Sequence, residues 1–342
     1  MKRSLNITVL MDAACIPAED PEFLLQDPKE VTTEYHVVGA LRRLGHAVSI
    51  LGVAHSVPDM LAPLVEKKPD LVFNLTEVFR EKRRFDSNIA ALLELMEIPF
   101  TGTGSTGLML CRDKGLSKQL LSLHRIRVPG FASFPPGRPP AVPKLLRYPM
   151  VVKPAYADGS EGISNASLVS GEEALVERVR MVHERWQQPA IAEEYIEGRE
   201  LYVGVVGNRR LSVFPPRELF LNQAEGQGPV LATYRVKWDE QYQEKWHIRF
   251  GFADLDETVL PRIARTCRNV FHILQLRDYA RIDLRLTPEN RLVILEVNPN
   301  PDIAYGEEVA EAAEKVGISY ERLIARIVRH ALRRYGNGAR RS

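Results

Sequence analysis

The sequence has few cysteines and no long apolar run, and each lack excludes a class of protein. The 342 residues include 3 cysteines, Cys15, Cys111 and Cys267, which lie far apart and form no C-x-x-C pair. This spacing argues against a disulfide framework or a zinc knuckle and is typical of a reducing cytoplasm. No stretch approaches the ~20 apolar residues that a membrane span needs. The sequence therefore predicts a cytoplasmic protein without a membrane partner.

Net charge is also nearly absent. The chain has 46 Lys and Arg against 44 Asp and Glu, for a formal charge of +2. Such a balance favours neither nucleic acid nor acidic lipid as a partner. The basic C-terminal stretch 324–342 has arginines in a helical pattern, and cations late in a helix suit its dipole. We therefore expect no nucleic-acid partner, although an RNA-binding arm is the alternative interpretation of that stretch.

Alternating strand and helix patterns occupy the first third of the chain. The strand-like runs are LNITVL, HAVSIL and DLVFNL, and the helical patterns are EYHVVGALRRLG and DSNIAALLELME. This alternation indicates an α/β unit with a parallel sheet. The stretch 16–30 is long for a loop between a strand and a helix, and such loops are often functional.

After a proline-rich connector over 134–149, the pattern changes. It predicts a strand at MVVKP, a glycine-rich loop over 155–167, a helix over 172–186, paired strands within 189–208, an irregular stretch over 222–250 and a helix over 260–274. Stiff, exposed connectors are typically rich in proline.

Residues 280–298, ARIDLRLTPENRLVILEVN, predict a hairpin with a turn at TPEN. Pairing Thr287 with Asn290 places Arg281 opposite Glu296, and Asp283 opposite Ile294. One side then carries the four polar residues Arg281, Asp283, Glu296 and Asn298. These residues form either a solvated face with one ion pair or, given phosphate ligands elsewhere, a Mg²⁺ site.

Two lysines are placed to bind those phosphates. Lys153 ends a buried strand directly before a loop that contains Gly159, Ser160 and Gly162, whose backbone N–H groups can fold over an anion. Lys114 lies just inside a predicted helix start, which also favours anions. The Walker A pattern is absent, so a P-loop is excluded.

Four segments, in their order along the chain, resemble the ATP-grasp superfamily, most closely the D-alanine-D-alanine ligase family. They are FTGTGSTG with the following DK, VVKPAYADGSEGI, EEYIEGRE, and RIDL with LEVNPNPD. The likeness extends from residue 70 to about residue 332. It implies an α/β fold with a Rossmann-like domain over 1–105, a central lid domain over 106–193, a C-terminal ATP-grasp domain over 194–336 and a flexible tail over 337–342.

The resemblance also implies roles for single residues. The ATP-binding set comprises the phosphate-binding lysines Lys114, Lys153 and Lys237, the lid residues Gly159, Ser160 and Gly162, the adenine hinge Glu193, Glu194, Tyr195 and Ile196, and the ribose-binding Glu200. The ligands of two Mg²⁺ ions, with Mn²⁺ as a possible substitute, would be Asp283, Glu296 and Asn298. Arg281 would stabilise the oxyanion, with Ser160 and Lys237 also in catalytic positions.

The chain departs from the family pattern where amino acids bind. Gly159 and Ser160 stand where the family has two serines, Trp238 where it has a tyrosine, and Asp302 where it has a glycine. We expect Asp302 to face a substrate ammonium, because an anion beside a developing oxyanion is unfavourable. The family's glutamate for the substrate amino group is best matched by Glu34, with Glu19 a weaker candidate.

We therefore predict an ATP-dependent carboxylate-amine ligase that works through an acyl phosphate on small, amino-acid-like substrates other than two D-alanines. One alternative is an authentic D-alanine-D-alanine ligase, and another is a catalytically silent ATP-binding protein with the same fold. A homodimer is expected from the resemblance.

Overall fold

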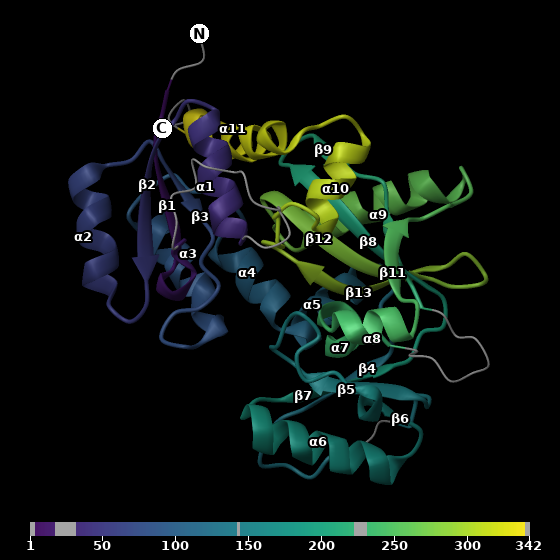
Figure 1. Ribbon diagram of the computed structural model, residues 1–342. Coiled ribbons are helices and arrows are strands. Elements are labelled where there is room, and N and C mark those ends of the chain that lie inside the picture. The colour runs from purple at the N-terminus through teal and green to yellow at the C-terminus, as the bar shows by residue number, and fades with distance from the viewer. Residues whose placement is uncertain (1–3, 18–31, 142–143, 222–230, 339–342) are drawn as a thin grey trace.

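The computed structural model describes residues 4–17, 32–141, 144–221 and 231–338, which form three sheets (Figure 1). The first sheet is parallel, with strands β1 (Asn6–Asp12), β2 (Ala47–Val53) and β3 (Leu71–Asn74) in the order β2-β1-β3. Helices α1 (Thr33–Arg43), α2 (Val57–Lys67) and α3 (Asp86–Leu95) connect and cover it. The central β1 is buried along nearly its whole length, as expected for a parallel strand. The predicted parallel sheet is confirmed.

The second sheet is small and antiparallel. Its strands are β4 (Phe131–Phe134), β5 (Met150–Pro154), β6 (Leu168–Val169) and β7 (Ala190–Glu194), in the order β4-β7-β5-β6. It follows helices α4 (Ser105–Arg112) and α5 (Lys114–Leu123), and helix α6 (Glu172–Trp186) covers it. Leu175, Val179 and Val182 of α6 are fully buried in the same apolar cluster as strand β5. That spacing of three and four residues is the apolar stripe of a helix.

The third sheet is the largest. Its strands are β8 (Arg199–Gly207), β9 (Leu211–Val213), β10 (Arg217–Phe220), β11 (Arg249–Phe252), β12 (Asp278–Leu286) and β13 (Leu292–Asn298). The order is β11-β10-β8-β12-β13, with β9 on β8. Helix α9 (Val259–Ile273) packs under one face through Ile263, Cys267 and Phe271. The opposite face is left for polar side chains.

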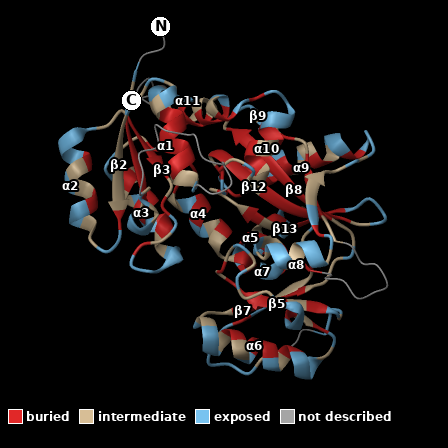
Figure 2. Ribbon diagram, viewed as in Figure 1, coloured by how far each residue is buried: buried red, intermediate tan, exposed pale blue. Residues whose placement is uncertain are grey.

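Helices α10 (Glu308–Lys315) and α11 (Tyr320–Gly338) join the first and third sheets (Figure 1). Leu323 and Ile327 of α11 share one core with Val37 of α1 and with Val206 of β8. Figure 2 shows the buried residues concentrated on β8, β12 and the helix faces that meet them. The N-terminal sheet is therefore fixed against the end of the large sheet by apolar packing.

Two expectations for the middle of the chain are wrong. The predicted strand pair within 189–208 does not form, because β7 pairs with β4 and β5 whereas β8 pairs with β10 and β12. Residues 195–198 instead carry the chain from one sheet to the other. The stretch predicted as irregular contains short helices α7 (Tyr234–Trp238) and α8 (Glu240–Lys245). Of the helices in the described ranges, none is long and apolar enough to cross a membrane.

The register of the β12–β13 hairpin also differs from the prediction. The Thr287 N–H donates to Arg291 O at 3.0 Å, so the turn is longer than assumed. A bulge then places Asp283 opposite Glu296, and Arg281 opposite Asn298. Ile294 lies opposite Leu284 and is buried in the core, not beside Asp283. The polar residues nevertheless remain on one face.

Candidate active site

The open face of the large sheet carries three rows of side chains that run across the strands. Directly opposed residues share a face of a sheet. The first row joins Gly204, Arg281 and Asn298, the second joins Phe252, Arg217, Tyr202, Asp283 and Glu296, and the third joins Leu219, Glu200, Arg285 and Val293. Neighbouring rows are about 7 Å apart along a strand. The sheet therefore presents a fixed grid of charged groups.

Arg281 is held in place by acidic groups on two elements. It donates to Asp283 at 2.9 and 3.1 Å and to Glu308, at the start of α10, at 3.0 Å. Burial opposes its charge, but Asp283 and Glu308 outweigh burial and raise the pKa of Arg281 above its ordinary value. Arg281 is therefore a permanent, oriented cation, as oxyanion stabilisation requires.

Asp283 and Glu296 are the paired carboxylates of the second row. The Asn298 amide donates to Asp283 at 3.2 Å, which brings all three predicted metal ligands together. Burial raises the pKa of Asp283, although Arg281 acts in the opposite direction. A cation beside it would therefore stabilise its charged form. Carboxylate and amide oxygens are ligands that suit Mg²⁺. Among the described residues, no cluster of three His, Cys, Asp or Glu could hold a metal ion.

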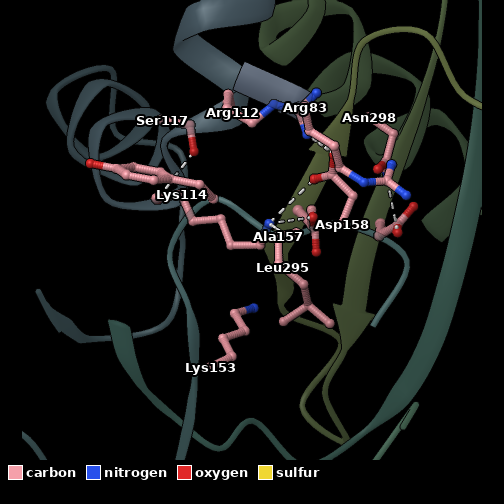
Figure 3. Close-up of polar contacts among 12 residues, drawn as sticks. Arg83, Arg112, Lys114, Ser117, Lys153, Ala157, Asp158, Leu295 and Asn298 are labelled. Atoms are coloured by element: carbon pink, nitrogen blue, oxygen red, sulfur yellow. Dashed lines mark hydrogen bonds and ion pairs between the residues drawn. The ribbon is translucent and has the colours of Figure 1, made fainter. Parts of the chain in front are cut away.

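Glu296 is also bound to Lys114. The Lys114 ammonium lies 2.8 Å from Glu296 and 3.6 Å from Asp158, and it donates to Ala157 O. Figure 3 shows this ammonium between the loop that carries Ala157 and Asp158 and strand β13. Burial would raise the pKa of Glu296, but Lys114 and Lys153 lower it far below its ordinary value. Glu296 is therefore ionised at any physiological pH.

A second buried ion cluster joins α5, β5 and β7. Glu193 Oε1 lies 3.1 Å from Lys118 Nζ and 3.1 Å from Lys153 Nζ. Lys118 also donates to Leu295 O at 2.5 Å. Burial would raise the pKa of Glu193, yet the two lysines hold it below its ordinary value. The cluster orients Lys153 toward the gap between the second and third sheets.

The third row forms another ion pair. Arg285 donates to Glu200 at 2.7 Å, and Tyr202 Oη donates to the same carboxylate at 2.9 Å. Burial would raise the pKa of Glu200, but Arg285 and Lys237 lower it. The Lys237 ammonium, from α7, lies 5.1 Å from the centre of the Tyr202 ring, a cation–π contact.

The predicted lid loop, residues 157–163, lies across this face. Arg112 of α4 pairs with Asp158, and the Trp238 indole donates to Gly159 O at 3.1 Å. Gly159 and Ser160 both have positive φ, of 60° and 63°, so the loop turns back sharply at this point. The loop is therefore tied to α4 and to α7 by separate contacts.

Two neighbouring cavities are bordered by most of the predicted site residues. The smaller, of about 90 Å³, is lined by Lys153, Ser160, Glu193, Glu194, Tyr195, Ile196, Glu200, Lys237, Asp283 and Glu296. The larger, of about 490 Å³, is bordered by Gly159, Lys237, Trp238, Arg281, Asn298 and Asp302 among the predicted residues. Lys237 of α7 borders both, so the two cavities lie next to each other at this helix.

The wall of the larger cavity is acidic at the start of α10. Burial, together with the Asp302 and Glu308 carboxylates, raises the pKa of Glu307 to about 7. Asp302 accepts a hydrogen bond from Thr33 Oγ1 at 2.5 Å and another from Ala304 N at 2.8 Å. Asp302 therefore also ties the start of α1 to the loop after β13.

Three predicted residues do not line either cavity. Lys114 is 3% exposed and lies behind Glu296. Gly162 points its carbonyl to Arg178 of α6, at 2.7 Å. Glu34 lies in the first turn of α1, where burial, and to a smaller extent the Asp302 carboxylate, raises its pKa. The weaker candidate Glu19 lies outside the described residues.

The structure adds residues that the sequence analysis missed. Lys118 follows Lys114 by one helical turn, and Arg285 follows Asp283 on the same face, so periodicity could have indicated both. Glu308 and Arg217 carry no such signal, because their partners come from distant segments.

Comparisons with known proteins show which family the chain resembles. Residues 138–329 match the family model for the D-ala D-ala ligase C-terminus. The chain is 30% identical over 312 residues to a D-alanine-D-alanine ligase of Rhizorhabdus wittichii, covering 88% of this chain and 91% of that protein. It is 33% identical over 308 residues to the uncharacterised protein y4sG of Sinorhizobium fredii, covering 88% of each.

Solved structures share the fold. The D-alanine-D-alanine ligase of Bacillus anthracis complexed with ATP superposes with a TM-score of 0.74 at 19% identity, over 98% of this chain and 100% of that one. The VanG D-Ala:D-Ser ligase of Enterococcus faecalis gives 0.71 at 20%, over 96% and 100%. The chain belongs to the D-alanine-D-alanine ligase-like family of ATP-grasp enzymes, which are ATP-dependent ligases.

Proposed function

We propose that the protein joins a carboxylate to an amine at the expense of ATP, with amino-acid-like substrates other than two D-alanines. The observation that carries this proposal is the grid on the large sheet, where Arg281, Asp283, Glu296 and Asn298 lie together beside a cavity rimmed by Lys153 and Lys237. Two lysines at the wall of a cavity that would hold the phosphates, next to an arginine fixed by carboxylates, suit phosphoryl transfer followed by acyl transfer.

ATP would occupy the smaller cavity and its extension toward the larger one. The base would lie along Glu193, Glu194, Tyr195 and Ile196, the ribose against Glu200, and the phosphates against Lys153 and Lys237. This assignment uses the walls of the 90 Å³ cavity. A triphosphate is larger than that volume, so the loop over 157–163 would have to move outward when nucleotide enters.

In the first step a substrate carboxylate attacks the γ-phosphorus of ATP, giving an acyl phosphate and ADP. In the second step the amine nitrogen attacks the acyl carbon, loses a proton and expels inorganic phosphate. When bound at Asp283, Glu296 and Asn298, Mg²⁺, or Mn²⁺ in its place, supplies charge neutralisation for both steps. Arg281 stabilises the oxyanion of the tetrahedral intermediate, and the lid loop excludes water from the acyl phosphate.

Lys114 would enter the reaction only after a change of partner. Its ammonium now pairs with Glu296, at 2.8 Å. The Lys114 ammonium would reach the phosphates only by giving up this contact with Glu296, which is also one of the residues that would hold Mg²⁺. Gly162 would act through the shape of the loop, because its carbonyl is used by Arg178.

The amino-acid side of the site supports altered substrates. Asp302, Glu307 and Trp238 border the larger cavity, and each brings a charge or a bulk that a site for two alanines would not need. We propose that Asp302 faces a substrate ammonium through the carboxylate oxygen not used by Thr33. Glu34 would contribute to the same negative potential from α1.

The test is a screen of amino-acid pairs for phosphate release, run with and without Mg²⁺. We expect turnover with at least one pair other than D-alanine with itself, and only with the metal present. Turnover with D-alanine alone would instead support an authentic D-alanine-D-alanine ligase, which several relatives are named to be. A homodimer in the cytoplasm is proposed by family likeness, and sedimentation at micromolar concentration would test the dimer.

A further inference from the structure

The larger cavity contains a buried arginine that the proposed ATP and metal sites do not use. Arg217 lies on β10, borders the 490 Å³ cavity and is only 6% exposed. Arg217 pairs directly with Tyr202 on the neighbouring strand, and Tyr202 pairs with Asp283. The Arg217 side chain is therefore on the same face of the sheet as the grid of charged groups. At about 4.8 Å per strand, it begins roughly 10 Å from Asp283.

The contacts of Arg217 leave part of its guanidinium unsatisfied. One terminal nitrogen pairs with Glu311 of α10, and the guanidinium carbon lies 5.4 Å from the centre of the Phe252 ring. Nε has no hydrogen-bond partner within the ranges that the structure describes. A buried donor left unpaired is destabilising. Burial also lowers the pKa of Arg217, although Glu308 and Glu307 act against it.

The nearby acidic groups are already engaged. Glu308 pairs with Arg281 at 3.0 Å, and the Glu307 side chain is hydrogen-bonded to Glu308, so both carboxyl groups already have other partners. An arginine presents its donors as a planar fork that fits a carboxylate with two parallel hydrogen bonds. Nε itself is enclosed by protein, but the Arg217 side chain borders the 490 Å³ cavity, so this guanidinium is chemically suited to an oxyanion bound there.

We propose that Arg217 binds a substrate carboxylate that does not take part in the reaction and thereby selects substrates with a second anionic group. This inference rests on the proposed ligase function. The reacting carboxylate lies by Arg281 and the grid, and the second lies toward β10, across the width of the larger cavity. The second carboxylate belongs either to the amine substrate, as in an amino-acid acceptor, or to a dicarboxylic donor.

The experiment compares substrates that differ only in that group. Each active pair from the screen is assayed with the acceptor amino acid and with its α-amide, and with each acidic donor and its side-chain amide. The variants are Arg217→Gln and Arg217→Lys, the latter keeping the charge but not the fork. Arg249→Gln is the matched control, since this exposed arginine of β11 stacks on Phe220 outside the cavity.

We expect the wild-type protein to prefer one carboxylate over its amide, and Arg217→Gln to raise KM for that carboxylate at least about 30-fold while leaving KM for the amide unchanged. Arg217→Lys should recover part of the preference. Whichever of the two substrates shows the effect identifies the source of the carboxylate. A preference that survives in both Arg217 variants would overturn the inference and leave the ligase function standing.

Glu311→Gln separates binding from folding. If Arg217 serves only to hold α10 through Glu311, this variant would reproduce the KM change, and the inference would be wrong. If wild type releases phosphate with no pair, the ligase proposal fails. Calorimetric binding of the amino acids and their amides, with a non-hydrolysable ATP analogue present, then decides the inference. Discrimination lost in Arg217→Gln supports it, and equal binding refutes it.

Discussion

Replacing Glu193 by glutamine tests whether the buried ion cluster between the sheets is held together by charge. Glu193 Oε1 contacts Lys118 and Lys153 at 3.1 Å each, and the three side chains are 5%, 3% and 9% exposed. Removing one partner of a buried ion pair costs about 3–5 kcal/mol. The glutamine carbonyl still accepts one hydrogen bond, worth about 1 kcal/mol. We therefore expect the free energy of unfolding to fall by about 2–4 kcal/mol.

The assay is urea unfolding followed by circular dichroism at pH 7.5, without nucleotide. Glu197→Gln is the matched control, because Glu197 is exposed in the connection between β7 and β8. Adding Lys118→Met to Glu193→Gln removes one of the two unbalanced charges and should recover part of the loss. A change no larger than that of Glu197→Gln, or no recovery in the double variant, would refute the electrostatic account of this cluster.

Three further predictions concern the grid and the larger cavity. Asp283→Asn and Glu296→Gln should each lower kcat at least about 100-fold, and unchanged Mg²⁺-dependent phosphate release in both would contradict the metal assignment. The melting temperature of Asp283→Asn should stay close to wild type because Glu308 still pairs with Arg281, whereas that of Glu296→Gln should fall because the buried Lys114 loses its partner at 2.8 Å. Glu307→Gln should be more stable than wild type at pH 8 and equal to it at pH 4 in urea titrations. The raised pKa of Glu307, about 7, makes the stability of the wild-type protein fall as pH rises from about 4.5 to 7, and the difference at pH 8 should be about 1–3 kcal/mol. Equal stability of the two proteins at both pH values would show that burial does not penalise this carboxylate. Asp302→Gly should change the amine preference in the pair screen, and an identical profile would remove Asp302 from the substrate site.

Much of the lining of the smaller cavity could be predicted from the sequence. Strand ends, glycine-rich loops and helix starts are local features, and anions bind at such places for local reasons. Lys153 at the end of β5 and Ser160 in the following loop lie beside the same small cavity, together with Glu193. The alternation of polar and apolar residues along β12 likewise predicts which side of the sheet is open.

The rest depends on contacts between segments far apart in the chain. Arg217 meets Glu311, and Arg281 meets Glu308, only because α10 packs over the end of the large sheet. The predicted pairing within 189–208 failed for the same reason. A short connection between two strand patterns favours a hairpin, but apolar packing against α6 and α9 assigns the strands to different sheets.

The β12–β13 hairpin shows how a wrong register can still give a correct face. A longer turn than TPEN shifts the pairing by one residue, which alone would move Glu296 to the side opposite Asp283. The bulge at Leu295 adds one residue to β13 and restores the alternation, so Asp283 and Glu296 become directly opposed instead of diagonal. Direct opposition brings the two carboxylates closer than the predicted arrangement, and their repulsion needs a cation between or beside them. In this structure the Lys114 and Arg281 side chains supply the positive charge, and in the proposed reaction a divalent ion would also neutralise the two carboxylates.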